Sequence, residues 1–247
     1  MKALVVALAA LALAGCGSAS DASTGPLVVS AAASLQKAFT SYGFDGGDVR
    51  FSFAGSDQLA AQIRQGVKPD VFASANTKLP QQLYAAGLVE KPTVFAGNRL
   101  VLAVPASAQK VTSLKDVEQP GVKLAIGSAT VPVGSYTRKV LAGLSAAERA
   151  KVMANVRSEE PDVKGIVGKL TQGAVDAGFV YITDVRAAKG ALRAIELPAA
   201  LKPSAAYGIA VVKGARHVAA AKRFIAGLLH GAGERALRGA GFEPPPR

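Results

Sequence analysis

Apolar segments of strand type alternate with segments of helical periodicity from residue 27 almost to the end of the chain. A short helix is predicted to open at Ser113, and a longer one begins at the pair Ser145 and Glu148, which have capping-box spacing. This alternation indicates an α/β fold with mostly parallel sheets flanked by helices. The other predicted strands are residues 27–29, 49–54, 70–73, 100–104, 122–126, 175–181 and 207–212, and the other predicted helices are residues 34–42, 56–65, 76–87, 163–172, 183–189, 215–229 and 233–238.

Two long apolar strands, residues 100–104 and 207–212, enclose the middle of the chain. The backbone is therefore expected to cross twice between two lobes, which is a double-crossing hinge with a cleft between the lobes. Residues 26–105 and 206–247 are predicted to form lobe 1, and residues 106–205 are predicted to form lobe 2.

The N-terminal segment carries the features of an export signal and a tether. A basic start precedes an apolar run, residues 3–14, which is shorter than the roughly twenty residues that span a bilayer. Residues 1–15 are therefore predicted to be a signal peptide. The sequence LAGC that ends at Cys16 resembles the bacterial lipobox, which implies lipidation of this cysteine. Residues 16–25 are then the lipidated cysteine and a flexible tether of small polar residues.

These features predict an exported protein that is anchored through Cys16 to the outer face of the cell membrane, or held in the periplasm, without crossing the bilayer. The alternative is an ordinary signal peptide with an unmodified cysteine. The sequence holds 1 cysteine, so an intramolecular disulfide and thiol catalysis elsewhere are excluded.

The formal net charge is +12, yet Lys and Arg are scattered and form no block interleaved with aromatic residues. Nucleic-acid binding is therefore not expected. Two interpretations of the charge stay open: a solvated basic surface, or a positive field that steers anions or contacts anionic lipid heads.

Side chains suited to catalysis or to metal binding are scarce. The 2 histidines, His217 and His230, lack the spacing of metal ligands. Residues 165–171 superficially resemble a phosphate loop, but their spacing is wrong and their pattern is helical. The sequence has no Gly-x-Ser-x-Gly elbow, and nothing pairs its carboxylates as acid and base. We therefore expect no catalytic residue, no bound metal cation and no cofactor.

What remains is a recurring junction in which an apolar strand leads through a small or polar residue into a helix. It occurs at Ser34, at Ser56 and near Val133, and another helix begins at Val163. Helix N-termini expose N–H groups without partners and a partial positive charge, so they suit anions. The alternative for Ser34 and Ser56 is that each hydroxyl only caps its own helix.

Seven short motifs, in the same order along residues 27–243, resemble those of the periplasmic molybdate-binding proteins of ABC importers. Each motif is weak by itself, and their joint order is specific. The motifs are AAASL at residues 31–35, FAGSDQLAAQI at residues 53–63, PDVFASA at residues 69–75, GNRLV at residues 97–101, VPVGSY at residues 131–136, EPDVK at residues 160–164 and GFVYITD at residues 178–184.

The resemblance implies a two-lobed type II periplasmic-binding-protein fold that closes on molybdate or tungstate. It implies that Ser34 and Ser56 bind the anion through hydroxyl and N–H, Val133 and Val163 through N–H alone, and Tyr181 through its phenol. It further implies a monomer that delivers its ligand to a permease and ATPase complex, with no cofactor and with molybdenum present only as the oxyanion.

Two features depart from this pattern. Some relatives carry a serine where this chain has Gly55, and Asp57 and Asp162 flank two of the implied contacts. A carboxylate that pointed inward would repel a dianion, and the helical pattern predicts that both point away.

The chemistry of the anion agrees with a site made of donors. Molybdate and tungstate are fully ionised at neutral pH, whereas phosphate carries a proton that needs an acceptor. Sulfate has the same charge and shape and is smaller, so cavity size must exclude it. The alternatives are a binding protein for sulfate, phosphonate or ferric ion, an oxyanion-sensing domain, and an enzyme that acts on an oxyanion ester.

Overall fold

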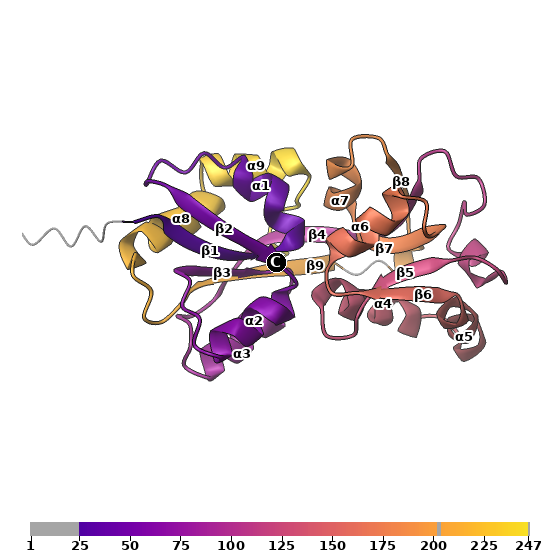
Figure 1. Ribbon diagram of the computed structural model, residues 1–247, viewed down its shortest axis with the longest axis horizontal. Helices are drawn as coiled ribbons and strands as arrows, with labels where there is room; N and C mark the ends of the chain where they lie inside the picture. Colours follow the sequence, from indigo (N-terminus) through magenta and orange to yellow (C-terminus); the bar gives the residue numbers. More distant parts are fainter. Residues whose placement is uncertain (1–24, 202–203, 247) are drawn as a thin grey trace, which may run out of the picture.

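The structure is a computed structural model that describes residues 25–201 and 204–246. The predicted signal peptide, Cys16 and almost all of the tether lie outside the described residues. The chain folds into two α/β halves that lie side by side, and long strands run between them (Figure 1).

In the first half, β1 (Leu27–Ala32) pairs in parallel with β2 (Val49–Ala54) on one side and with β3 (Val71–Ser74) on the other. Helices cover both faces of this sheet, with α1, α8 and α9 on one face and α2 and α3 on the other (Figure 1). A short 3₁₀ turn, η1 (Ala33–Leu35), leads from β1 into the first helix. The helices are α1 (Gln36–Thr40), α2 (Ser56–Arg64), α3 (Lys78–Ala85), α8 (Val218–Leu229) and α9 (Ala232–Ala240).

The second half repeats this plan around β5 (Leu124–Gly127), which pairs in parallel with β6 (Val156–Glu160) and with β7 (Ala177–Tyr181). The predicted capping box is confirmed, because the side chains of Ser145 and Glu148 each accept the other residue's backbone N–H. The helical elements are η2 (Lys115–Glu118), α4 (Pro132–Ala142), α5 (Ala146–Ala154), α6 (Val163–Thr171), α7 (Ile182–Ala187) and η3 (Ala199–Leu201).

Two long strands connect the halves: β4 (Thr93–Pro105) and β9 (Ser204–Val211). They pair with each other in antiparallel fashion. β4 also pairs antiparallel with β7 and with β8 (Leu192–Ile195), and β9 pairs antiparallel with β3. The predicted α/β class is therefore confirmed, while parallel pairing is confined to the two outer parts of a mixed sheet. The exact limits of the lobes stay a prediction.

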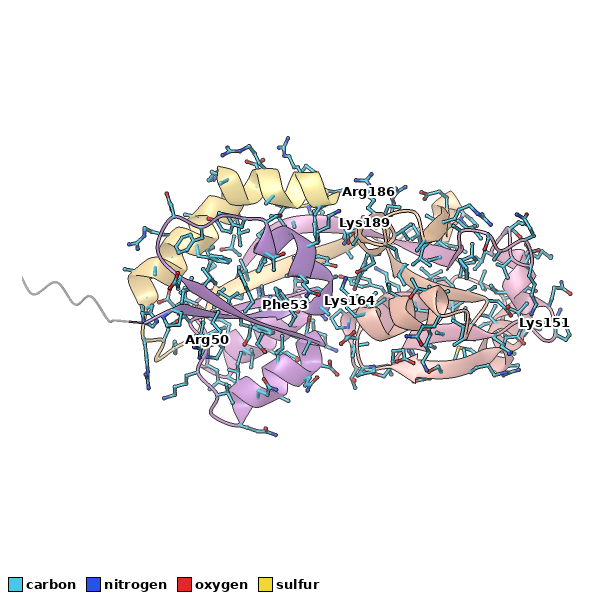
Figure 2. The ribbon with its side chains drawn as sticks, turned by 45° about the horizontal axis from the view of Figure 1, so that its top comes forward. Arg50, Phe53, Lys151, Lys164, Arg186 and Lys189 are labelled. Carbon is cyan, nitrogen blue, oxygen red and sulfur yellow. The ribbon has the colours of Figure 1, made fainter. Side chains whose placement is uncertain are left out.

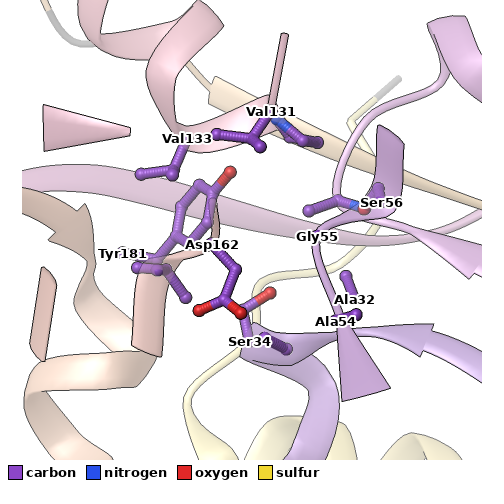
Figure 3. Close-up of a pocket in the computed structure, with 13 residues that line it drawn as sticks. Ala32, Ser34, Ala54, Gly55, Ser56, Val131, Val133, Asp162 and Tyr181 are labelled. Carbon is purple, nitrogen blue, oxygen red and sulfur yellow. The ribbon is translucent and has the colours of Figure 1, made fainter. Parts of the chain in front are cut away.

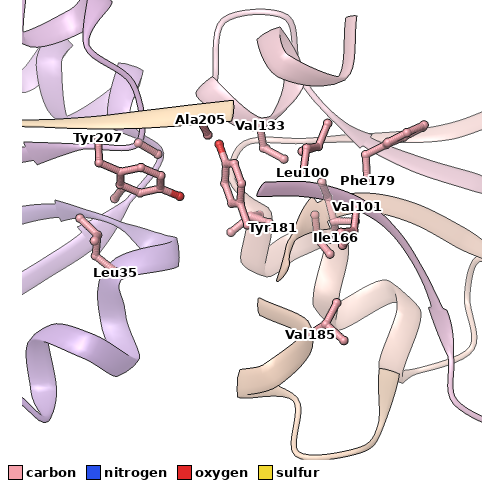
Figure 4. Close-up of a cluster of buried hydrophobic side chains, with 14 of the residues drawn as sticks. Leu35, Leu100, Val101, Val133, Ile166, Phe179, Tyr181, Val185, Ala205 and Tyr207 are labelled. Atoms are coloured by element: carbon pink, nitrogen blue, oxygen red, sulfur yellow. The ribbon is translucent and has the colours of Figure 1, made fainter. Parts of the chain in front are cut away.

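A continuous hydrophobic core runs from the first half into the second. Phe39, Tyr42 and Phe224 pack with ring centroids 5.0–6.3 Å from aromatic neighbours beneath α1 and α8. A smaller core lies under α2 and α3 and includes Leu59 and Leu83. Figure 4 shows the part of the main core at the junction of the halves, where Tyr181 and Tyr207 meet.

Two strands, β6 and β8, were not predicted. β6 reads Val-Arg-Ser-Glu-Glu and forms an end of the strand order, and β8 pairs with β4 alone. Edge strands need less apolar surface than central ones, so they leave a weak pattern in the sequence. Among the described residues, we find no helix that is long and apolar enough to cross a membrane.

Basic side chains are distributed over both halves, as Arg50, Lys151 and Lys164 illustrate (Figure 2). The described structure therefore agrees with the scattered arrangement seen in the sequence.

Candidate anion-binding site

A small pocket lies between the two halves, where the ends of parallel strands lead into helices (Figure 3). Its volume is about 20 Å³. All five residues predicted from the sequence line it, and the two halves both contribute. The lining residues are Ala32, Ala33, Ser34, Ala54, Gly55, Ser56, Ala75, Val131, Pro132, Val133, Asp162, Val163 and Tyr181.

The hydroxyls of the two serines are not used as helix caps, which removes the alternative interpretation of both residues. Ser34 lies inside η1, and Ser56 is the first residue of α2 after the N-cap Gly55, with no hydrogen bond from a capping side chain in either element. Ser56 Oγ accepts the N–H of Ala75 at 3.1 Å. A hydroxyl has one proton and two lone pairs, so the Ser56 proton stays free to bind a ligand.

The backbone N–H groups of Val133 and Val163 have no partner within the described residues. Val133 follows Pro132, the first residue of α4, and Val163 is the first residue of α6. Amides at these positions cannot donate within their own helix. The Asp162 carboxylate instead accepts the next two amides of α6, at 2.7 Å from Lys164 N and 3.1 Å from Gly165 N. The N-termini of α4 and α6 therefore border the pocket, and each offers one backbone N–H that has no partner among the described residues.

Tyr181 brings a buried phenol to the pocket. Its hydroxyl oxygen has no hydrogen-bond partner in the described part of the chain, and its ring packs edge-to-face against Tyr207, with centroids 5.8 Å apart (Figure 4). Burial, helped by the nearby phenols of Tyr207 and Tyr136, raises the pKa of Tyr181 well above its ordinary value. The phenol therefore keeps its proton and can act as a donor.

We expect the variant Tyr181→Phe to affect stability and binding in opposite directions. A buried hydroxyl without a partner costs about 1–3 kcal/mol, so its removal should raise the melting temperature of the ligand-free protein. The same change should weaken binding of the anion about tenfold or more, because a donor is lost. Calorimetric melting and titration measure the two effects. A lower melting temperature with unchanged affinity would show that the phenol serves the fold and not the ligand.

The two aspartates differ in their position. Asp57 is not among the lining residues, although its Oδ1 is buried without a hydrogen-bond partner in the described part of the chain, so the expectation that it points away stays a prediction. Asp162 does line the pocket, so the expectation is wrong for this residue (Figure 3). The reason is that its carboxylate turns back to cap α6, which holds it at the pocket rim.

Among the lining residues that the structure describes there is no lysine, arginine or histidine. Lys164 follows the lining residue Val163 in the chain, and its Nζ lies 3.6 Å from the buried Asp184 carboxylate. Burial raises the pKa of Asp184 to about 6, although the Lys164 ammonium opposes that shift. The pocket wall itself is thus formed by neutral donors and by the Asp162 carboxylate.

A second group of polar residues, behind the pocket wall, was not predicted. Tyr207 Oη lies 3.0 Å from Ser34 Oγ, and Asn98 Nδ2 lies 3.2 Å from Tyr207 Oη and 2.9 Å from Thr183 Oγ1. Asn98 belongs to the GNRLV motif and Tyr207 begins a predicted strand, but their contact depends on the pairing of β4 with β9. Only the fold could bring them together.

Two α/β halves, two crossing strands and a donor-lined pocket between the halves define a protein that binds a small solute. The chain belongs to the bacterial extracellular solute-binding protein family, whose model matches residues 19–243. The resemblance drawn from the seven motifs is thereby confirmed, and members of this family bind solutes and are not enzymes.

The relatives are similar along nearly the whole chain. The molybdate-binding protein ModA of Mycobacterium tuberculosis is 37% identical over 258 residues, which cover 98% of this chain and 97% of that protein. ModA of Haemophilus influenzae is 30% identical over 98% of this chain and 99% of that protein.

Solved structures confirm the fold. The periplasmic molybdate-binding protein of Azotobacter vinelandii matches with a TM-score of 0.79 and 22% identity, over 89% of this chain and 100% of that chain. The sulfate-binding protein SubI of Mycobacterium tuberculosis matches with a TM-score of 0.78 and 16% identity, over 90% of this chain and 87% of that chain. The fold alone therefore does not distinguish between the two anions.

Proposed function

We propose that the protein captures molybdate, and tungstate equally, in the pocket between its halves and delivers the anion to an ABC importer. The observation that carries this proposal is the set of donors that have no partner among the described residues, namely the Tyr181 hydroxyl and the N–H groups of Val133 and Val163. The Ser34 and Ser56 hydroxyls complete the set. The 37% identity to molybdate-binding proteins supports the same ligand.

The donor set favours a fully ionised tetrahedral anion. Such an anion accepts hydrogen bonds on every oxygen, and charged acceptors form stronger bonds than neutral ones. Hydrogen phosphate carries a proton that the amide donors cannot accept, and the Asp162 carboxylate is the one charged acceptor in the described pocket wall. Sulfate would leave longer gaps to the same donors because it is smaller. Molybdate and tungstate are nearly equal in size, so we expect little discrimination between them.

A thermal-shift screen against oxyanions tests the proposal. A ligand that binds only the folded state stabilises it by about 2.7 kcal/mol at a concentration of 100 Kd. Molybdate and tungstate should therefore raise the melting temperature by several degrees, and sulfate and phosphate at equal concentration should not. A sulfate shift equal to that of molybdate would contradict the assignment of the ligand.

Replacement of either serine tests the site. Ser34→Ala and Ser56→Ala each remove one hydroxyl donor, and a hydrogen bond to a charged group is worth about 1.5–3 kcal/mol. We expect each variant to bind molybdate at least about tenfold more weakly in a calorimetric titration. Ser41→Ala is the matched control, because Ser41 donates to the carbonyl of Ala38, 3.0 Å away, and does not line the pocket. Wild-type affinity in both test variants would remove the serines from the site.

We further propose that the protein acts as a monomer, held to the membrane through a lipid on Cys16. The LAGC sequence supports the anchor, and a 31% identical relative in Bacillus subtilis is described as a putative ABC transporter substrate-binding lipoprotein. In a bacterium with lipoprotein processing, the wild type should sediment with membranes, and Cys16→Ser should lose that fraction. Mass spectrometry of a mature N-terminus far beyond Cys16, without acyl chains, would contradict the anchor.

A further inference from the structure

A second cavity, here called the outer cavity, lies at the end of the first half that is remote from the anion-binding pocket. Its volume is about 500 Å³. It is bordered by the start of β1, by β2, by the loop before β3 and by the loop between β9 and α8. β1 begins at this end and runs toward the junction of the halves (Figure 1). Its 6 residues, at about 3.3 Å each, put roughly 20 Å between the two sites.

Three basic side chains from three separate segments line the outer cavity: Arg50, Lys68 and Arg216. All three are exposed, and none of them forms an ion pair with another described residue. A Cβ atom added at Gly214 would lie 3.4 Å from Lys68 Nζ, so the loop that carries Arg216 lies against the lysine. The fold therefore gathers positive charges that are scattered in the sequence.

One carboxylate, that of Asp70, also lines the outer cavity, and its hydrogen-bonding capacity is already used. It accepts the N–H groups of Val28 and His217, each at 2.8 Å, and its Oδ2 lies 2.9 Å from His217 Nδ1. Burial alone would raise the pKa of Asp70, yet these hydrogen bonds hold the pKa below its ordinary value. The carboxylate is thus a buried structural group, and the exposed wall of the cavity is positive.

Exposed apolar side chains flank these cations. Among the described residues, the exposed large hydrophobic side chains include Val67 at 50% and Val218 at 38%. They are the chain neighbours of Lys68 and His217, which line the outer cavity. Basic side chains beside exposed apolar ones are typical of a surface that meets lipid headgroups and the adjoining acyl region. A soluble anion would use the charges alone.

We infer that the outer cavity binds the phosphate headgroup of an anionic phospholipid and docks the first half on the membrane, with the anion-binding pocket held away from the bilayer. The inference rests on the lipid anchor proposed above. Residues 17–24 separate Cys16 from Gly25, which lines the outer cavity, and this stretch reaches at most about 30 Å. The anchor would thus keep headgroups at a high effective concentration around the cavity, where weak contacts are sufficient.

A fluorophore on Val67→Cys tests the docking. The full chain, produced in a bacterium with lipoprotein processing, is reconstituted into vesicles of phosphatidylcholine alone or mixed with phosphatidylglycerol. Each vesicle carries a quencher on the headgroup of a minor lipid, and mass spectrometry establishes that only the new cysteine is labelled. Phosphatidylglycerol should increase the quenching strongly, and high salt should reverse the increase. A label on Lys151→Cys, toward the opposite end of the molecule from Arg50, should not respond (Figure 2).

A charge variant identifies the site. It combines Arg50→Gln, Lys68→Gln and Arg216→Gln. Each Lys or Arg near an anionic surface strengthens association about fivefold, so the docked state should become about 100-fold less favourable. The matched control removes the same charge from exposed residues of α4 and α5 and should keep the response to phosphatidylglycerol. It combines Lys139→Gln, Arg149→Gln and Lys151→Gln.

The outcomes separate the inference from the proposed function. Loss of the response in the first variant and its retention in the control support the inference, and an equal response in both overturns it in favour of attraction by net charge. If sodium phosphate abolishes the response and sodium chloride of equal ionic strength does not, the cavity binds a soluble anion and the headgroup assignment fails. If Cys16 proves unmodified, the anchor fails, and the same assay on Cys16→Ser still tests the cavity. Both charge variants should bind molybdate like the wild type, which shows that they fold.

Discussion

Val163→Pro should weaken molybdate binding about 100-fold or more while the fold stays intact. Proline has no N–H, so the variant loses a hydrogen bond to a charged ligand, and the proline ring occupies the space of the lost proton. Val163 is the first residue of α6, a position that tolerates proline. The preceding residue, Asp162, has φ −158° and ψ 174°, which is the extended backbone that a residue before proline requires.

The matched control is Val163→Ala, which keeps the N–H and removes only part of the side chain. It should bind molybdate within a few-fold of the wild type. Circular dichroism and the melting temperature establish that both variants fold, and titration calorimetry measures their affinity. If a folded Val163→Pro protein binds as tightly as Val163→Ala, this amide does not contact the anion.

Gly55→Val should weaken binding about 100-fold by preventing the two halves from closing. Gly55 has φ −58° and ψ 134°, a backbone open to any residue, so only space forbids a side chain. A Cβ atom there would overlap the carbonyl oxygen of Pro161 and would lie 3.5 Å from Val131 Cγ1, both of which belong to the other half. Within its own half it would lie 2.9 Å from Asp57 Oδ1, the end of a side chain that can turn aside. Overpacking of this kind costs about 1–3 kcal/mol, and the halves can avoid it by staying apart.

The ligand-free protein can avoid the overlap by opening, so its melting temperature should change little. Small-angle scattering with saturating molybdate should show a larger radius of gyration for Gly55→Val than for the wild type. Gly168→Ala is the control: Gly168 lies on α6, and outside the backbone of that helix no described atom lies within 4 Å of an added Cβ. Equal affinity of Gly55→Val and Gly168→Ala would mean that closure does not depend on the glycine.

The alternation of strands and helices determined the class of the fold. Segments such as residues 49–54 and 163–172 have the periodicity of their element, and the structure places β2 and α6 there. β6 and β8 escaped prediction because they lie at edges of the pairing, where few apolar residues are needed. Periodicity reports burial, so it is informative for central elements and weak for peripheral ones.

The pocket residues were accessible from the sequence through local signals. Four of them lie where a helical element begins: Ser34, Ser56, Val133 and Val163. The start of a helix can be predicted from the residues next to it in the sequence. Tyr181 came from the family motif. The sequence could not show which hydrogen-bond partner each polar group has or which way each side chain points. Whether Ser56 caps its helix or accepts from Ala75, and whether Asp162 faces the pocket or the solvent, depends on atoms from distant segments.

The sequence by itself thus determined the α/β class, the family and the helix starts that border the pocket, because each of these is set by residues that are near one another in the chain. The tertiary structure alone decided the approach of Gly55 to Pro161 and the contact of Ser34 with Tyr207, 173 residues apart. It also decided that Asn98 Nδ2 donates to Tyr207 Oη. Such contacts arise when β4 pairs with β9 and the two halves meet, and the strength and direction of a hydrogen bond depend on that final geometry.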